Sequence, residues 1–213
     1  MNIEIYKTSI LSSIFFENLC LEIQPIFVEF SPSGHNLLTI KNKFTKKPNQ
    51  YLMVARENNS IVGFCSFYET NQYGLRVMNF SGTVISQPFH SQGLFKELIK
   101  KGINCIHADV LVTCSQNPRV YESLRKFTCS IIPDILTPYN YDQKLLCIML
   151  EHCKRDSFDD NTIGLLKNYY SRDNIAGDSR TTRSGLSQKI FTVLGDKDAI
   201  VVGGVVKKSL TTA

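Results

Sequence analysis

The sequence predicts an α+β protein with a mixed, mostly antiparallel central sheet flanked by helices. Three observations support this fold class. Residues 75–106 change from a strand period to a helix period. Two β-rich segments joined by a polar turn come before them, at residues 51–68. Short apolar runs typical of buried strands follow, at residues 110–114 and 199–206.

The composition is that of an ordinary globular protein. The chain has 213 residues, 43% of them hydrophobic and 20% charged, which suits one domain or one domain with an appendage. No run approaches the roughly 18 apolar residues that span a bilayer. The first residues, MNIEIYKTS, lack both a basic start and a cleavage site. We therefore expect a cytoplasmic protein that does not enter a membrane.

Charge and cysteines exclude several functions. The net charge of +5 is dispersed and does not indicate nucleic-acid binding. The seven cysteines are odd in number, lack a C-x-x-C pair and mostly lie in apolar runs, so we expect buried thiols in a reducing compartment. Cys147, His152 and Cys153 lack the spacing of a structural zinc site, and we expect no bound metal.

The elements before residue 75 are assigned from period and turn residues. Residues 2–6 alternate as a strand, and residues 10–26 carry a helical pattern that Pro25 should end or kink. A short helix is expected over residues 37–44. Strands over 51–55 and 61–68 are joined at residues 56–60 as a hairpin.

The next stretch is the centre of the prediction. The alternating strand over residues 75–85 places Asn79, Ser81 and Thr83 on one face. Pro88 should stop it, and an amphipathic helix follows over residues 94–106. The turn between them delivers free amides to a helix start, which is an anion site that a diphosphate fits. A plain strand-turn-helix remains the alternative.

Residues Val84 to Phe95, VISQPFHSQGLF, resemble the acyl-CoA-binding motif of the GNAT superfamily of N-acyltransferases, Gln/Arg-x-x-Gly-x-Gly/Ala. Gly93 matches the central glycine, whereas His90 stands where the family has Gln or Arg, and Phe95 replaces the final small residue. The order of elements over residues 1–133 is also similar to that of the family. The resemblance therefore implies a GNAT-like fold and acetyl-CoA as cosubstrate.

The resemblance also implies which residues hold acetyl-CoA. The acyl group and pantetheine would bond to backbone at the end of the strand, and the diphosphate would lie on the amides that follow. Asn117, which should also cap a helix that starts at Pro118, is a further candidate ligand. The cofactor-binding candidates are Thr83, Val84, Ile85, Gln87, His90, Ser91, Gln92, Gly93, Leu94, Phe95 and Asn117.

The sequence offers few candidate groups for the proton transfers of the reaction. The family's acid is often a tyrosine seven residues beyond the asparagine, but that position holds Leu124. Tyr121, three residues earlier on the same helix face, is the candidate catalytic acid, and packing is its other reading. No carboxylate lies on the central strand, so its three polar residues would order a water. Glu69 is the nearest acid by topology.

The rest of the chain is assigned more coarsely. We expect residues 1–136 to form the acyl-CoA-binding core and residues 137–213 an extension that completes the sheet and shapes the acceptor site. Residues 141–153 are a strand or a short helix, and residues 188–194 a helix. The final strand, 199–206, should pair with residues 129–132 or with 141–150.

The predicted function is transfer of an acetyl group from acetyl-CoA to a primary amine by direct attack in a ternary complex. The alternatives are a silent CoA-binding protein with the same fold, and transfer of a different acyl group. The partners are thus an acyl-CoA and an unidentified amine, and a homodimer is left open.

Overall fold

The computed structural model describes residues 1–30, 36–134, 142–154, 164–167, 169, 191, 194 and 198–210. The chain forms two compact units. Unit 1 holds Met1–Thr70 and Met78–Ile106, and unit 2 holds Asn71–Val77 and His107–Ala213. The predicted fold class, a mixed and mostly antiparallel sheet with flanking helices, is confirmed. The proposed boundary between residues 136 and 137 stays a prediction.

The strands of unit 1 are mostly neighbours in sequence. Strand β2 (Gln50–Glu57) pairs antiparallel with β1 (Asn2–Lys7) and with β3 (Ser60–Gln72), and a short 3-10 helix, η1 (Thr8–Ile10), follows β1. The predicted hairpin is confirmed. Its turn is Asn58-Asn59, with φ of 49° and 66°, and two left-handed residues match the twist of the flanking strands.

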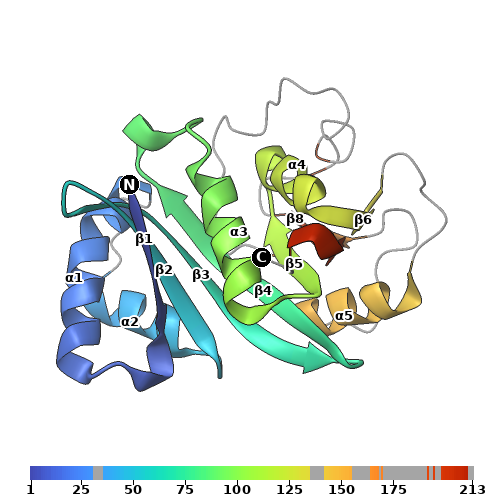
Figure 1. Ribbon diagram of the computed structural model, residues 1–213, viewed down its shortest axis with the longest axis horizontal. Coiled ribbons are helices and arrows are strands. Elements are labelled where there is room, and N and C mark those ends of the chain that lie inside the picture. The colour runs from blue at the N-terminus through green and yellow to red at the C-terminus, as the bar shows by residue number, and fades with distance from the viewer. Residues whose placement is uncertain are drawn as a thin grey trace. The chain divides into compact units, whose positions relative to one another are not determined.

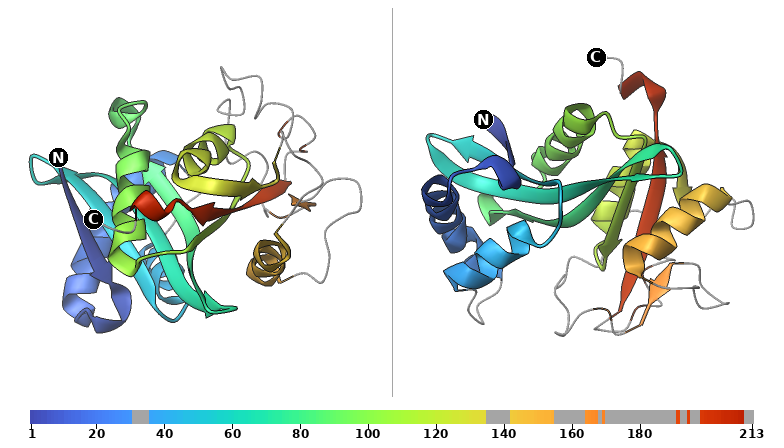
Figure 2. Two further views of the ribbon diagram at one scale, coloured as in Figure 1. Left: turned by 45° about the vertical axis from the view of Figure 1, so that its right-hand side comes forward. Right: turned by 90° about the horizontal axis from the view of Figure 1, so that it is seen from below.

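The helices of unit 1 lie on both faces of its strands. Helices α1 (Ser13–Phe30) and α2 (Leu37–Thr45) cover one face, and α3 (Leu94–Ile106) covers the other (Figures 1 and 2). The Asn36 side chain caps α2 by accepting the Thr39 amide at 2.9 Å. Since β4 (Leu75–Ile85) belongs to unit 1 from Met78 onward, it ends beside α3, where the chain turns back into that helix.

Pro25 was expected to end or kink the first helix, and the end is wrong, because α1 continues to Phe30 with Pro25 inside it. A proline leaves the carbonyl four residues earlier, at Leu21, without its amide. Both residues are exposed, so water can bond that carbonyl. The next turn buries Ile26 and Phe27, and this packing offsets the missing bond.

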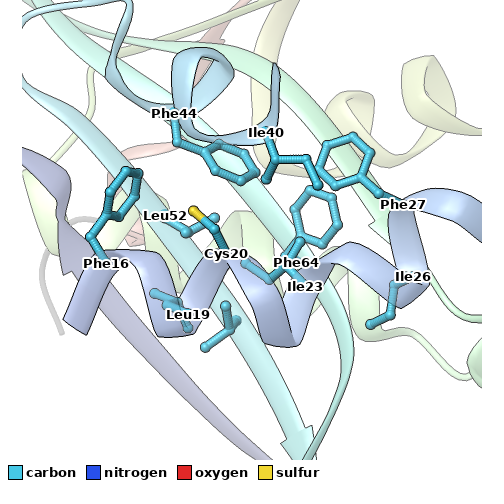
Figure 3. Close-up of a cluster of buried hydrophobic side chains, with 11 residues drawn as sticks. Phe16, Leu19, Cys20, Ile23, Ile26, Phe27, Ile40, Phe44, Leu52 and Phe64 are labelled. Atoms are coloured by element: carbon cyan, nitrogen blue, oxygen red, sulfur yellow. The ribbon is translucent and has the colours of Figure 1, made fainter. Parts of the chain in front are cut away.

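The core of unit 1 between α1, α2 and the strands is rich in aromatic rings (Figure 3). Phe64 on β3 is 1% exposed, and its ring centroid lies 4.8 Å from that of Phe27 and 5.7 Å from that of Phe44. Offset and edge contacts of this kind add to the free energy gained by burying the rings. This cluster holds α1 and α2 on the same face.

Unit 2 is built around its C-terminal strand. Strand β8 (Ala199–Val206) lies between β5 (Val110–Ser115) and β6 (Thr128–Ile132), antiparallel to both, and the two-residue β7 (Leu165–Leu166) also pairs with it. A short 3-10 helix, η4 (Lys208–Leu210), follows β8. The predicted pairing with residues 129–132 is thus confirmed, and the pairing with 141–150 is wrong.

Two helices flank the strands of unit 2. Helix α4 (Pro118–Phe127) precedes β6. The segment for which a strand or a short helix was expected forms a helix, α5 (Gln143–Cys153), so the strand alternative is wrong. The Asp142 carboxylate caps α5 by accepting the Lys144 and Leu145 amides. The apolar face of α5 packs on Val112 of β5 and Val201 of β8. The helix expected over residues 188–194 lies largely outside the described residues.

Two further expectations concern solvent and membrane. Among the described residues, no helix is both long and apolar enough to cross a membrane. All seven cysteines are free thiols, but only Cys20 and Cys65 are fully buried, while Cys105 and Cys129 are exposed. The expectation of mostly buried thiols is therefore wrong. Apolar runs that form amphipathic helices and edge strands leave some positions facing water.

Candidate functional site

The candidate site in unit 1 is the turn between β4 and α3. After Ile85 the chain forms a short 3-10 helix, η2 (Gln87–Phe89), and α3 starts at Leu94. Ser91 and Gly93 have positive φ, 63° and 85°. A glycine tolerates this conformation at no steric cost, and the two left-handed residues turn the chain into the helix.

Five consecutive backbone amides of this turn are available to a ligand. Within the described part of the chain, the amides of residues 91–95 donate no hydrogen bond. The helical bonds begin at Lys96 and Glu97, whose amides both donate to the Gly93 carbonyl at 2.9 and 3.2 Å. Free amides at the positive end of a helix dipole attract an anion. The predicted row of donors is confirmed from Ser91 to Phe95.

His90 does not belong to that row. Its amide donates to the Gln87 carbonyl at 3.1 Å, and its ring Nε2 lies 2.6 Å from the Ile85 carbonyl oxygen. The Gln92 side chain likewise donates to the Pro88 carbonyl at 2.8 Å. These two side chains bond carbonyls of their own loop. They therefore hold the loop's shape while its amides stay unbonded.

We expect His90→Gln to keep most of the affinity for acetyl-CoA and His90→Leu to lose about threefold to tenfold. A glutamine side chain can still donate to the Ile85 carbonyl, and one such bond contributes about 0.5–1.5 kcal/mol. Titration calorimetry with acetyl-CoA measures the difference. Equal affinities for the two variants would show that the ring does not hold the loop.

Strand β4 carries a bulge before it reaches this turn. The Met78 side chain would touch a Cβ at Gly102 of α3, so Met78 faces α3. Ile85, seven residues later, also faces α3, because Ile85 and Leu94 both lie 3.2 Å from a Cβ built on Gly63. Strict alternation would put residues an odd number apart on opposite faces. One extra residue between them is a β-bulge, a feature common beside active sites.

The bulge overturns the expectation that Asn79, Ser81 and Thr83 share one face. The Asn79 amide donates to the Thr70 hydroxyl at 3.0 Å, whereas the Thr83 hydroxyl donates to Cys65 Sγ at 3.2 Å. Thr70 and Cys65 lie on opposite faces of β3, since five residues separate them. A single polar channel along β4 is therefore not formed.

Cys65 accepts the hydrogen bond from Thr83, a residue of the predicted site, and this contact was not predicted from the sequence. Its thiol is fully buried, and this desolvation raises its pKa to about 12, although the bond from Thr83 acts in the opposite direction. The group thus stays a neutral thiol at ordinary pH and is no nucleophile. Its contact instead fixes the Thr83 side chain, so that the backbone of residues 83–85 is what β4 offers to a ligand.

The remaining predicted site residues, Asn117 and Tyr121, belong to unit 2. The Asn117 side chain accepts the Arg119 amide at 2.9 Å, which confirms its role as a helix cap. Tyr121 is fully buried on α4, and its hydroxyl donates to the Pro133 carbonyl at 3.0 Å. Both residues sit at the start of α4, immediately after β5.

Acidic and metal-binding groups near the turn are few. Glu69 accepts the Tyr51 hydroxyl at 3.4 Å, and Glu29 of α1 accepts the Gln87 amide at 3.4 Å, a contact that was not predicted. No group of three His, Cys, Asp or Glu side chains that could hold a metal occurs among the residues the structure describes.

The architecture is similar to that of solved acetyltransferases. Aminoglycoside 6'-acetyltransferase type Ii superposes with a TM-score of 0.53 at 12% identity, over 97% of this chain and 98% of that chain. A GNAT-family acetyltransferase from Streptococcus pneumoniae gives 0.49 at 10% identity, covering 96% and 100%. Ribosomal-protein-alanine N-acetyltransferase from Brucella melitensis biovar Abortus 2308 gives 0.44 at 19% identity, covering 59% and 87%. No curated protein sequence matches the chain.

The mixed sheet and its flanking helices have the fold of the first of these acetyltransferases. Residues 16–118, which include β4, the turn and α3, match the model of the acetyltransferase (GNAT) family. This segment, a little under half of the chain, is therefore similar to the GNAT family.

Proposed function

We propose that the protein transfers an acetyl group from acetyl-CoA to a primary amine. The observation that carries the proposal is the row of five free amides at residues 91–95, which follows a bulged strand directly. A diphosphate accepts hydrogen bonds from such a row, and the helix dipole adds about 0.3–1 kcal/mol per charge at an exposed terminus. The proposed cofactor residues are therefore the backbone of Thr83–Ile85 and of the turn.

The chain's own groups would assist the chemistry as follows. The amine nitrogen, in its neutral form, attacks the thioester carbonyl; a C–N bond forms, the C–S bond breaks, and the nitrogen releases one proton to solvent water. A backbone amide of residues 83–85 aimed at the developing oxyanion could contribute about 3–4 kcal/mol. Tyr121 is the proposed donor of a proton to the departing thiolate. Its hydroxyl bonds Pro133 at present, so this role requires the hydroxyl to exchange that acceptor for the sulfur.

The loop itself offers a matched pair of variants. Ser91 is exposed and has φ of 63°, a conformation that Asp and Asn both tolerate. Ser91→Asp adds a negative charge beside the free amides, and Ser91→Asn adds the same shape without charge. Because a like charge repels a diphosphate, we expect Ser91→Asp to weaken acetyl-CoA binding at least about tenfold and Ser91→Asn to leave it nearly unchanged.

Thermal unfolding with acetyl-CoA, dephospho-CoA and ATP in parallel measures this. Ligand at a hundred times its Kd should add about 2.7 kcal/mol of stability. The largest shift should come with acetyl-CoA, and at the same ligand concentration a tenfold higher Kd in Ser91→Asp should reduce the added stability to about 1.4 kcal/mol or less, whereas Ser91→Asn should keep it. No shift with any of the three compounds at millimolar concentration would remove the proposed function.

A silent CoA-binding protein is the second candidate. Two observations favour it: β4 carries no carboxylate that could act as a base, and Glu69 and Tyr121 both form hydrogen bonds within the fold. The two candidates differ in turnover: a silent protein would show the thermal shift with acetyl-CoA and release no free CoA thiol with any amine.

A further inference from the structure

A pair of lysines reaches the helix-α2 side of β3 and β4 in unit 1. The Lys43 ammonium lies over the Phe27 ring at 5.1 Å from its centroid, and Lys47 lies over the Tyr68 ring at 5.3 Å. An aromatic face attracts a cation and keeps the long side chain in one place. Neither ammonium therefore samples the surface as a free lysine does.

A buried glutamine fixes the backbone that carries both lysines. Gln50 is 1% exposed; its amide nitrogen donates to the Lys43 carbonyl at 2.9 Å, and its amide oxygen accepts the Lys47 backbone amide at 3.2 Å. The oxygen and the nitrogen of the Gln50 side-chain amide are thus both hydrogen-bonded to backbone. The turn after α2 is thus held at a set distance from β2, and the two lysines keep their spacing.

Lys43 lies next to the proposed acetyl-binding backbone. A Cβ built on Gly82 would lie 3.6 Å from both Cε and Nζ of Lys43. Gly82 directly precedes Thr83, and a longer side chain there would compete with the lysine for this space. The glycine therefore lets a cation approach the bulged part of β4 within one residue of the proposed site.

The same face of the strands carries polar groups with hydrogen-bonding capacity. Ser66, which lies between Cys65 and Phe67 and so faces the α2 side, is fully buried, and its hydroxyl has no partner among the described residues. Asn79 lies on this side too, where it bonds Thr70. A buried hydroxyl without a partner costs free energy and indicates that a water or ligand completes it.

The charges of these lysines are not all neutralised by the protein. Lys41, also on α2, forms an ion pair with Glu17 at 3.4 Å. Lys47, by contrast, forms no ion pair with any residue in the described ranges. A cation such as Lys43 beside a site for an amine disfavours a polycationic acceptor and favours one that also bears a negative charge.

We propose that the acceptor amine carries an anionic group, a carboxylate or a phosphate, which Lys43 and Lys47 bind on the α2 side of β3 and β4. This inference rests on the proposed acetyl transfer, whose reacting backbone adjoins Lys43. The lysines orient the acceptor so that its amine reaches the end of β4. They act as binding residues and take no part in proton transfer.

A pair of acceptors that differ in one group tests the proposal. With acetyl-CoA in excess, we expect the wild-type protein to acetylate γ-aminobutyrate with a higher kcat/KM than n-butylamine. Lys43→Gln should lower kcat/KM for γ-aminobutyrate about tenfold or more, mainly through KM, since hydrogen bonds to charged groups are the strong ones. It should lower kcat/KM for n-butylamine by much less, so that the preference for γ-aminobutyrate is lost. An equal preference for the two acceptors in the wild type would overturn the proposal.

Lys46→Gln is the matched control, because Lys46 is an exposed lysine between the other two. It should change neither acceptor's kinetics. A loss for γ-aminobutyrate as large in Lys46→Gln as in Lys43→Gln would point to diffuse charge and overturn the assignment. The thermal shift with acetyl-CoA should persist in all variants, so that its absence would mark failure of the proposed function instead.

Binding without turnover gives a second readout if neither amine reacts. The CoA-loaded protein is titrated by calorimetry with glutarate and, separately, with inorganic phosphate, which distinguishes the two anionic groups. We expect one of them to bind, and the Lys43→Gln/Lys47→Gln double variant to lose that binding. No binding of either anion to the loaded wild-type protein would overturn the proposal.

Discussion

Tyr121→Phe is expected to lower kcat for acetyl transfer at least about a hundredfold, since a positioned general acid contributes about 10²–10⁴-fold. The substitution removes only the hydroxyl that donates to Pro133 at 3.0 Å. The free energy of unfolding should fall by about 1 kcal/mol, the contribution of one hydrogen bond. Release of CoA thiol gives the rate, and urea unfolding gives the stability.

Tyr51→Phe is the control, because it removes a hydroxyl that bonds Glu69 at 3.4 Å and has no proposed role in proton transfer. A Tyr121→Phe protein that keeps its kcat and loses only stability would assign Tyr121 to packing. Acetyl-CoA binding should be equal in both variants, which separates loss of the acid from loss of the cosubstrate site.

Phe64→Ala should lower the free energy of unfolding by about 3–5 kcal/mol, the usual cost of truncating a buried phenylalanine. Phe64 is 1% exposed and contacts the rings of Phe27 and Phe44, so the cavity would open between α1, α2 and β3 (Figure 3). The surrounding rings are held by several elements and cannot close the space. Chemical denaturation of the purified variant measures the loss.

Leu38→Ala is the comparison for that experiment. Leu38 lies on α2, which packs on the same cluster, but it is 64% exposed, and exposed substitutions usually change stability by less than about 0.5 kcal/mol. If Phe64→Ala cost no more than Leu38→Ala, the ring cluster would not be the core that holds α1 and α2 to the sheet.

The sequence predicted the bounds of an element best where a change of period, a proline or a cap residue marks them. The strand over residues 75–85 and the helix over residues 94–106 have the observed bounds, and the cap at Asn117 is as expected. Pro25 misled because a local rule was outweighed by the packing of Ile26 and Phe27, which a sequence pattern does not weigh.

The free backbone amides of the candidate site could be predicted from the sequence, but the contacts of its side chains could not. Free amides follow from helix geometry, so Ser91 to Phe95 could be named in advance. The bulge in β4 was not predicted, although Gly82, with φ of 157° inside the strand, is the kind of residue that often marks one, and it puts Asn79 and Thr83 on opposite faces. Gln50 was missed because its contacts to Lys43 and Lys47 depend on a turn shape that only the folded chain shows.

The place of β8 in unit 2 bears on how the protein is made. This strand is the middle partner of β5 and β6, yet it follows β6 by some 65 residues of chain (Figure 2). On a ribosome, β5 and β6 emerge long before their shared neighbour, and each exposes an unpaired apolar edge meanwhile. Unit 1 has all its strands by residue 85 and can begin to fold during synthesis, whereas unit 2 must wait for translation to pass Val206.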